Sequence, residues 1–334
     1  MTMLTNSRST FSAVGIREDL SNIIYNISPM DTPAVSSMGR GTCDNTLFEW
    51  QTDALADAAQ NFQLEGDVPD ALAVTETVRL SNYTNISYKT VATTGTAEAV
   101  DFAGRRSSQA YQMAKRAKEI KRDMEFMVCS TNLKVAGSTS AARKSAGIQS
   151  YLGWKTAGTS SLINGGASTV VGIVNVSSSV GANGSAIGTA TTPTVVLTMA
   201  MINLCVQRCY EAGGAPDTMF CKPALKTKLS ALAGASLAEI RTQTKGDKQA
   251  HAINAVDVIV TDFGTFKFVP NRFCEANIVY VMDWDYWSIN YLRPFQTVNL
   301  AKTGDNVKQM MLAEWGVEAK NGRSSGAVVS VKDA

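Results

Sequence analysis

The sequence has very little of what a catalytic or metal centre needs. Its 334 residues include a single histidine, His251, in a polar Lys-Gln-Ala-His-Ala context that is typical of a solvated loop. A metal site or a Ser/His/Asp triad that relied on this histidine is the weaker interpretation. The chain also has no Walker-type phosphate-binding motif and no GxGxxG between an expected strand and helix. These absences argue against most nucleotide-dependent and histidine-based enzymes.

The remaining candidates for a chemical site are the cysteines and one pair of carboxylates. The six cysteines form no CxxC pair, although Cys205 and Cys209 stand one helical turn apart, where they could pair or hold half of a metal site. We interpret them as small buried hydrophobic residues in a reducing compartment. Asp283 and Asp285 alternate along an expected strand, so they share a face and repel each other. We interpret them as solvent-facing residues beside Trp284, and we expect no cofactor and no metal.

Charge and long apolar runs are also scarce. Charged residues make up 18% of the chain, below the usual quarter, and the formal net charge is +2. No global field therefore draws the chain to nucleic acid or to a membrane. The longest apolar runs, such as residues 256–260, fall far short of the ~20 residues that span a bilayer. Residues 1–8 contain no apolar signal core. We expect synthesis in the cytoplasm and no membrane partner.

The most informative segment, from Asn45 to Phe126, combines a long acidic loop with a basic helix. Residues 46–50 and 84–91 alternate apolar and polar side chains and are predicted to be the two strands of one hairpin. The roughly 30 residues between them, where a compact hairpin uses about two to five, carry six acidic residues, no lysine and no apolar cluster. Such a loop buries too little apolar surface to order itself. It is either a mobile loop or an arm that orders on another molecule.

A long amphipathic helix is predicted over residues 101–133, about 45 Å at ~1.5 Å per residue. Its apolar positions recur every three or four residues and mark one buried stripe. Basic residues dominate the other faces, with three acidic ones between them: Arg105, Arg106, Lys115, Arg116, Lys118, Lys121 and Arg122 against Glu119, Asp123 and Glu125. Basic stripes of this kind bind nucleic acid. The interspersed acids and the near-neutral chain favour instead a solvated or partner-facing helix.

The rest of the chain is patterned unevenly. Residues 1–44 are polar and turn-rich, with one expected helix at 16–27, and are interpreted as an arm that docks on something. Residues 136–194 are rich in Gly, Ser, Thr and Ala and are poorly determined. A helix is predicted from residue 193 to Ala212, ending at Gly213-Gly214. Beyond it we predict a helix at 224–233 and strands at 218–221, 256–260, 266–269, 278–282, 288–291, 295–300, 308–315 and 327–331, the last three returning to the long helix.

This order of elements resembles the major capsid proteins of tailed bacteriophages, which have the Hong Kong 97-type capsid fold. Local stretches agree with the resemblance, namely residues 15–25, 28–33, 49–53, 95–101, 118–125 and 211–217. The resemblance covers most of the chain, except roughly 155–192. It implies an α+β fold in five parts: an N-terminal arm (1–45), an extended β-hairpin loop (46–95), a peripheral domain (96–192) with a spine helix (101–133) and a Gly/Ser/Thr-rich insertion (155–192), an axial α/β domain (193–291), and return strands of the peripheral domain (292–334).

The resemblance implies assembly and no active site. Copies would join as pentamers and hexamers into an icosahedral virion shell that encloses packaged double-stranded DNA and forms in the host cytoplasm. The partners would be further copies, a portal, a separate scaffold or decoration protein, and DNA through weak, non-specific contact. Two alternatives stay open, an encapsulin-like bacterial compartment and a cytoplasmic α/β enzyme with an acidic lid.

In the family the extended loop lies over the peripheral domain of a neighbouring subunit. Because this loop is acidic and the helix is basic, we predict inter-subunit pairs between two groups of residues: Asp53, Glu65, Asp67 and Asp70 of one copy, and Arg105, Arg106, Lys115 and Lys118 of the next. Each exposed pair contributes ~0.2–1 kcal/mol, so repetition around a shell is needed. Some relatives link their shells through a loop lysine. Residues 51–79 contain no lysine, the nearest being Lys89, so we predict a shell without covalent links.

Overall fold

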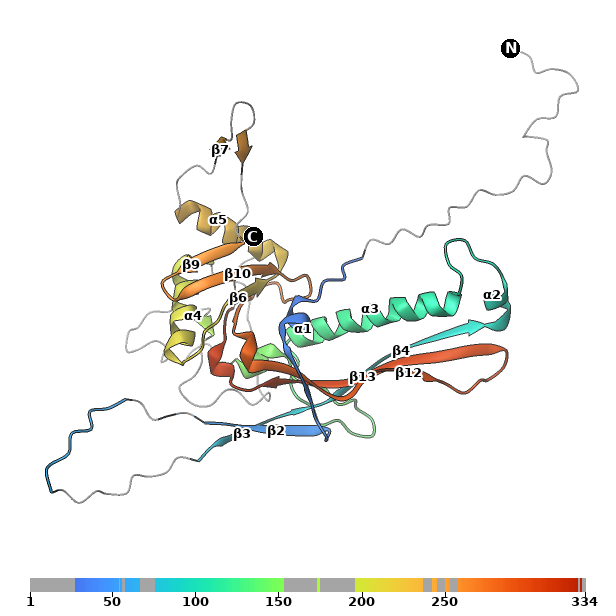
Figure 1. Ribbon diagram of the computed structural model, residues 1–334, viewed down its shortest axis with the longest axis horizontal. Coiled ribbons are helices and arrows are strands. Elements are labelled where there is room, and N and C mark those ends of the chain that lie inside the picture. Colours follow the sequence, from blue (N-terminus) through green and yellow to red (C-terminus); the bar gives the residue numbers. More distant parts are fainter. Residues whose placement is uncertain are drawn as a thin grey trace, which may run out of the picture.

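A four-stranded and a six-stranded sheet organise the part of the chain that the computed structural model describes. That part comprises residues 28–53, 55, 58–66, 76–152, 173–174, 196–236, 242–244, 250–252, 257–329 and 331. The strand orders are β1-β12-β13-β4 and β5-β14-β11-β6-β10-β9, and two hairpins, β2-β3 and β7-β8, project from the body (Figure 1). Within these ranges, none of the helices combines the length and the hydropathy that crossing a bilayer requires.

The four-stranded sheet has one face against a long helix. Its elements are β1 (Gly39–Thr42), β4 (Asn85–Thr94), β12 (Trp287–Asn299), β13 (Asn306–Ala319) and the helix α3 (Ser108–Cys129). β13 pairs antiparallel with β12 and with β4, and β1 pairs in parallel with β12. Side chains alternate between the two faces of a strand. Ala313 and Trp315 therefore enter the core with Met124 of α3, whereas Glu314 and Gly316 point to the opposite face.

The long helix is shorter than the predicted span 101–133. The hydroxyl of Ser107 accepts a hydrogen bond from the N–H of Ala110 at 3.2 Å and caps the first turn. The preceding residues cannot join the helix, because Phe102 and Arg105 form a β-bridge around Gly104, whose φ is 76°. The predicted buried stripe is confirmed, with Met113, Ile120, Met124 and Val128 buried.

The predicted hairpin paired the wrong strands. β2 (Leu47–Thr52) pairs with β3 (Val78–Tyr83), whereas the predicted partner strand 84–91 is β4 and belongs to the four-stranded sheet. Thr84 lies between β3 and β4, and its N–H donates to the carbonyl of Thr46 at 2.8 Å. The predicted strand pairs with β13 instead of β2 because β13 offers a longer partner: β13 pairs with β4 over ten residues, whereas β2 pairs with β3 over six.

The six-stranded sheet carries helices and its own core. Its elements are β5 (Ile173–Val174), β6 (Thr218–Cys221), β9 (Val258–Thr261), β10 (Gly264–Pro270), β11 (Val279–Met282), β14 (Gly326–Val328), α4 (Met199–Glu211) and α5 (Pro223–Ser236). Ile202 of α4 and Leu225 of α5 are fully buried with Phe266 in this core. The predicted strand 218–221 is confirmed, as is the glycine end of α4, where Gly213 has a φ of 88°.

Two expectations for this region need correction. α4 begins at Met199 and not at residue 193, because Thr198 is extended and caps the helix. The strands predicted at 288–291 and 295–300 are one continuous strand, β12. The last strand, β14, pairs with β11, with Val328 opposite Val279, while its Ala327 lies in the same core as Met124 of α3. The remaining elements are α1 (Pro33–Ser37), α2 (Gly95–Ala99), β7 (Thr242–Thr244), β8 (Ala250–Ala252) and the 3-10 turns η1 (Ile148–Tyr151), η2 (Trp284–Tyr286) and η3 (Gly322–Ser324).

A buried carboxylate ties the start of the described chain to the long helix. Glu125 of α3 has no exposed surface, and its two oxygens accept the N–H groups of Ala34 at 2.9 Å and Val35 at 2.8 Å, in the first turn of α1. The amide of Asn271 donates to the same carboxylate at 2.5 Å. Residues 33–42 are thus part of the body and not of a free arm, while the helix predicted at 16–27 lies outside the described residues.

The titration of Glu125 predicts how the stability of the folded protein depends on pH. Burial raises the pKa of this carboxyl above its ordinary value of 4.5, although the donors Val35, Ala34 and Asn271 oppose the shift. A raised pKa in the folded state means that protonation favours folding, so this contribution is complete below the unfolded pKa and is lost as the pH rises through the folded pKa. We expect the wild type to gain stability relative to Glu125→Gln as the pH falls from 7 toward 4.5, by about 1.4 kcal/mol for each unit of pKa difference.

Urea denaturation of the unassembled wild-type and variant subunits at several pH values measures this difference. The glutamine variant is the control, because it retains every other titrating group. A difference in stability that stayed constant with pH, or that changed in the opposite direction, would contradict the prediction.

Candidate inter-subunit surfaces

The β2-β3 hairpin carries a long loop away from the two sheets (Figure 1). Among the described residues of this loop, three apolar side chains face solvent almost completely: Leu55 is 97% exposed, Phe62 87% and Leu64 81%. We call them the apolar loop residues. The sequence interpretation, which stressed the acidic character of the loop, overlooked them because they are spaced too widely to form a cluster. Exposed apolar side chains on a projecting arm are typical of an interaction site.

The root of the hairpin is fixed firmly to the body. The indole N–H of Trp50 donates to the carbonyl of Ala319 at 2.7 Å, and the Trp50 ring lies 5.8 Å from that of Tyr151. On β3, the buried amide of Asn82 donates to the carbonyl of Val317 at 2.6 Å. A root with fixed side chains holds the loop in a set direction.

A cluster of charged side chains around a buried carboxylate lies at the junction between β3 and β4. Glu314 of β13 is 3% exposed, and its carboxylate accepts from the guanidinium groups of Arg143 at 2.5 Å and Arg293 at 2.8 Å. The hydroxyl of Thr84 donates to the same carboxylate at 3.1 Å. The cluster connects four segments that are distant in the sequence, so it stabilises the junction between the loop and the sheet.

Gly316 provides the closest approach between the hairpin and the sheet. A Cβ atom at this position would lie 2.6 Å from the ring of Phe48 and 3.1 Å from the carbonyl of Tyr83. We expect Gly316→Ala to displace the Phe48 ring and to lower the free energy of unfolding by about 1–3 kcal/mol, the usual cost of overpacking. Urea denaturation of the unassembled subunit measures the loss.

Gly39 offers a matched control for that substitution. It also lies in a strand of the four-stranded sheet, but a Cβ there would meet its nearest atoms at 3.4 and 3.7 Å, which is ordinary contact. Gly39→Ala should therefore change the stability little. Equal losses in the two variants would show that the contact with Phe48 is not the cause.

Of the charged residues predicted to pair, the structure describes all four basic ones and two of the four acidic ones. Arg105 turns inward, with its guanidinium 4.2 Å from the centre of the Phe102 ring. Arg106, Lys115 and Lys118 are exposed, and within the described residues they form no ion pair. Of the predicted acidic residues, Asp53 and Glu65 are exposed in the loop, and Asp67 and Asp70 lie outside the described residues.

The loop hairpin and α3 lie on opposite faces of the four-stranded sheet (Figure 1). Phe48 approaches Gly316 on one face, while the buried stripe of α3 packs with Trp315 on the other. Beyond the hairpin, the loop-side face is partly uncovered. It presents four side chains that we call the open apolar face, the exposed Ile86 (47%) and Tyr88 (61%) and the half-buried Val298 and Met310.

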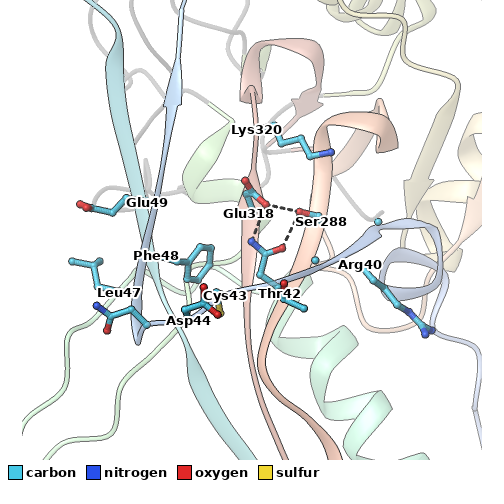
Figure 2. Close-up of a pocket in the computed structure, with 14 residues that line it drawn as sticks. Arg40, Thr42, Cys43, Asp44, Leu47, Phe48, Glu49, Ser288, Glu318 and Lys320 are labelled. Atoms are coloured by element: carbon cyan, nitrogen blue, oxygen red, sulfur yellow. Dashed lines mark hydrogen bonds between the residues drawn. The ribbon is translucent and has the colours of Figure 1, made fainter.

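A groove of about 510 Å³ runs between β1, β2 and the end of β13. The carboxylate of Glu318 lies beside Ser288 in Figure 2 and accepts from its hydroxyl at 2.7 Å. The amide of Asn290 donates to the same carboxylate at 2.8 Å. Burial, with the nearby carboxylates of Glu314, Asp44 and Glu318, raises the pKa of Cys43 to about 11. The Cys43 side chain is therefore a protonated thiol at neutral pH and not a nucleophilic thiolate.

Of the carboxylate pair, Asp285 is exposed as predicted, whereas Asp283 and the histidine differ from expectation. Asp283 is 6% exposed and not solvent-facing: it accepts the N–H groups of Ala215 at 3.0 Å and Asp285 at 3.3 Å and caps η2. Burial raises the pKa of Asp283. His251 lies in the short strand β8 and not in a loop. The interpretation of the cysteines is confirmed for five of the six, which are buried and free, and Cys43 is half-buried.

Comparison with known proteins identifies the family. A family model described as "SU10 major capsid protein" matches residues 3–332. The chain belongs to the SU10 major capsid protein family. A curated relative, the major capsid protein of Escherichia phage Phieco32, is 28% identical over 338 residues, which cover 94% of each chain.

Solved structures show that this major capsid protein has the fold of phage capsids. A chain of the cyanophage A-1(L) capsid asymmetric unit superposes with a TM-score of 0.68 at 13% identity, covering 98% of this chain and 99% of that one. A chain from Mycobacterium phage Adephagia gives a TM-score of 0.55 at 11% identity, with 96% and 95% covered. The structure of phage G gp27 major capsid proteins and gp26 decoration proteins gives 0.53 at 10%, with 99% and 100% covered. The predicted Hong Kong 97-type α+β fold and the role of phage major capsid protein are confirmed.

Proposed function

We propose that copies of this major capsid protein assemble as pentamers and hexamers into an icosahedral shell around packaged double-stranded DNA, and that the protein has no catalytic role. The observation that supports this most strongly is the projecting loop. It carries the three apolar loop residues into solvent on an arm whose root is fixed by Trp50 and Asn82. Only contact with another molecule removes these side chains from water, and a second copy is always present in a shell.

The open apolar face of a neighbouring copy is the docking surface that we propose for the loop. It lies on the same side of the sheet as the loop hairpin (Figure 1). Ile86 and Tyr88 offer apolar and aromatic surface to residues such as Phe62. Full burial of one such side chain contributes about 1.5–3 kcal/mol, which exceeds the ~0.2–1 kcal/mol of an exposed ion pair.

The charge pairing expected from the sequence stays a separate proposal. It joins Asp53, Glu65, Asp67 and Asp70 of one loop to Arg105, Arg106, Lys115 and Lys118 of the next copy. Because the loop and α3 lie on opposite faces of the sheet (Figure 1), the pairing requires the loop of one copy to reach the helix-covered face of the next. Arg105 would also have to leave the Phe102 ring.

We assign the parts of the chain to domains according to the plan of the capsid family. We assign residues 1–45 to the arm and its root, 46–95 to the loop and the strand that follows it, and the four-stranded sheet with α3 to the peripheral domain. The unit around the six-stranded sheet is the proposed axial domain, which would meet other copies around the five-fold and six-fold axes. A portal, and a separate scaffold or decoration protein, complete the proposed partners, and assembly is placed in the host cytoplasm.

The shell is proposed to be held without covalent links. The lysine nearest to the loop in the sequence, Lys89, lies on β4 and pairs with Asp123 of its own α3 at 2.7 Å and with Glu119 at 3.9 Å. A lysine held in this way is on the helix side of the sheet, away from the loop. Linked shells would instead need a lysine that reaches a neighbouring asparagine.

Size-exclusion chromatography and negative-stain microscopy of the purified full-length protein test the proposal. We expect closed shells of megadalton mass that dissociate on a denaturing gel to a single band at the mass of one chain. A protein that stayed monomeric at high concentration, with and without a co-expressed scaffold, would overturn the assembly proposal. A ladder of linked subunits on the gel would overturn only the non-covalent part.

A further inference from the structure

The exposed side of α3 carries a line of cations. Lys115, Lys118 and Arg122 are spaced by three and four residues, so with ~3.6 residues per turn they fall within about 60° of one another on the helix. Lys115 and Lys118 are exposed and Arg122 is half-buried. We call these three residues the basic stripe. It lies opposite the buried residues Ile120 and Met124 and points away from the sheet.

The acidic residues of α3 form their ion pairs with cations outside this stripe, although the Lys115 ammonium also helps to lower the pKa of Glu119. Glu119 accepts from Arg116 at 2.5 Å and lies 3.9 Å from Lys89, and Asp123 pairs with Lys89 at 2.7 Å. Burial opposes ionisation of Glu119, but Arg116 and Lys89 outweigh it, and the pKa of this carboxyl is lowered. Glu125 is turned into the core. Within the described residues, the basic stripe therefore has no ion-pair partner.

We infer that the basic stripe of α3 faces the packaged DNA and binds its phosphates without regard to base sequence. The inference rests on the proposed shell function and adds which surface of the subunit faces inward. The stripe extends about 10 Å along the helix, and one strand of duplex DNA presents about three phosphates over that length at ~3.4 Å per nucleotide. A row of three cations therefore meets a high density of negative charge wherever it contacts the duplex.

The arrangement favours DNA over the acidic loop of a second copy. The loop leaves the subunit on the other face of the sheet, and on that face the exposed side chains of Ile86 and Tyr88 are apolar. A formal net charge of +2 gives a single subunit little general affinity for nucleic acid. Repetition in a shell places many weak stripes on one surface, so that affinity for DNA arises mainly after assembly.

Cross-linking in DNA-filled particles tests the inference directly. Formaldehyde joins lysine amines to DNA, and peptide mapping by mass spectrometry then locates the linked residues. We expect Lys115 and Lys118 to carry most of the DNA adducts, and the exposed Lys302 and Lys320 to carry few. Adducts distributed equally over these four lysines, or absent from α3, would overturn the inference. Failure to obtain any DNA-filled particle would instead count against the proposed function.

A charge-removal variant gives the quantitative test. We expect the triple variant Lys115→Ser, Lys118→Ser, Arg122→Ser of the full-length subunit to lose salt dependence in binding a random duplex: the slope of log K against log salt should fall by about 0.9 for each phosphate contact removed. The triple variant Lys302→Ser, Lys308→Ser, Lys320→Ser is the control and should keep the wild-type slope. Equal slopes in all three proteins would overturn the inference. So would carbodiimide cross-links that join Lys115 or Lys118 to Glu65 of a second copy, because they assign the stripe to the loop.

Discussion

Replacing Leu55, Phe62 and Leu64 together by serine should leave the subunit folded and abolish shell formation. The three side chains contribute nothing to the core of their own copy, since they are 97%, 87% and 81% exposed. In the proposed shell each is buried against a neighbour, and each loses about 1.5–3 kcal/mol of contact energy on substitution. Every subunit in a closed shell makes this contact once, so the losses accumulate over all interfaces.

Negative-stain microscopy and size-exclusion chromatography measure the outcome, with circular dichroism as the check on folding. The matched control replaces the neighbouring polar residues Gln60, Asn61 and Gln63 by serine, which changes as many positions in the same loop without removing apolar surface. The control should still form shells. If the apolar variant also assembled at the wild-type yield, the contact would depend on the acidic residues, as the charge-pairing proposal holds.

Glu314→Ala should lower the free energy of unfolding by about 1.5–3 kcal/mol, the usual contribution of hydrogen bonds to a charged group. Arg143 and Arg293 both direct guanidinium groups at this carboxylate, which is 3% exposed, while their own side chains are 27% and 45% exposed. Without the carboxylate, two positive charges remain close together, and the hydroxyl of Thr84 loses its acceptor. The junction between the loop and the four-stranded sheet should weaken first.

Urea denaturation of the unassembled variant gives the magnitude. Glu49→Ala is the control, because Glu49 pairs with Arg79, whose side chain is 69% exposed, and exposed pairs contribute about 0–1 kcal/mol. A loss for Glu314→Ala no larger than that of the control would show that the two arginines find other partners or water.

Elements whose signals are local could be predicted from the sequence. The strand Thr218–Cys221 is a short apolar run between turn residues, and the end of α4 is signalled by Gly213, which takes a positive φ. The buried stripe of α3 follows from its periodicity alone. The start of α3 was placed too early, because the turn around Gly104 interrupts a stretch whose composition still suits a helix.

Which strands pair with each other could not be predicted, because the paired residues are far apart in the sequence. The alternation in residues 84–91 predicted a strand but could not show that its partner begins at Asn306, more than 200 residues later. β3 was missed because it contains Asn82, a polar residue that is fully buried and satisfied by Ser145 and Val317. Asp283 was misjudged for the same reason, since its carboxylate accepts the backbone N–H of Ala215, which belongs to another segment.

The sequence predicted that a long loop and a basic helix exist, but not how they are placed relative to each other. The long loop and the basic helix are visible in the composition, and the exposure of Lys115 and Lys118 agrees with it. The sequence could not show that these two features lie on opposite faces of one sheet, because that depends on the pairing of β4 with β13. The sequence also could not show that Leu55 and Phe62 are almost fully exposed to solvent, which is what makes them candidates for a contact.

The central position of β13 has a consequence for the timing of synthesis. This strand, Asn306–Ala319, pairs with both β4 and β12 and supplies the Gly316 and Ala319 contacts that fix the loop root. Its residues follow the hairpin strands β2 and β3 by more than 200 positions in the sequence, so they leave the ribosome later, and long-range pairing of this kind forms late in folding. A nascent chain therefore cannot fix the direction of its loop before β13 has been synthesised. A chain truncated before Asn306 would lack every contact that β13 makes with the loop root.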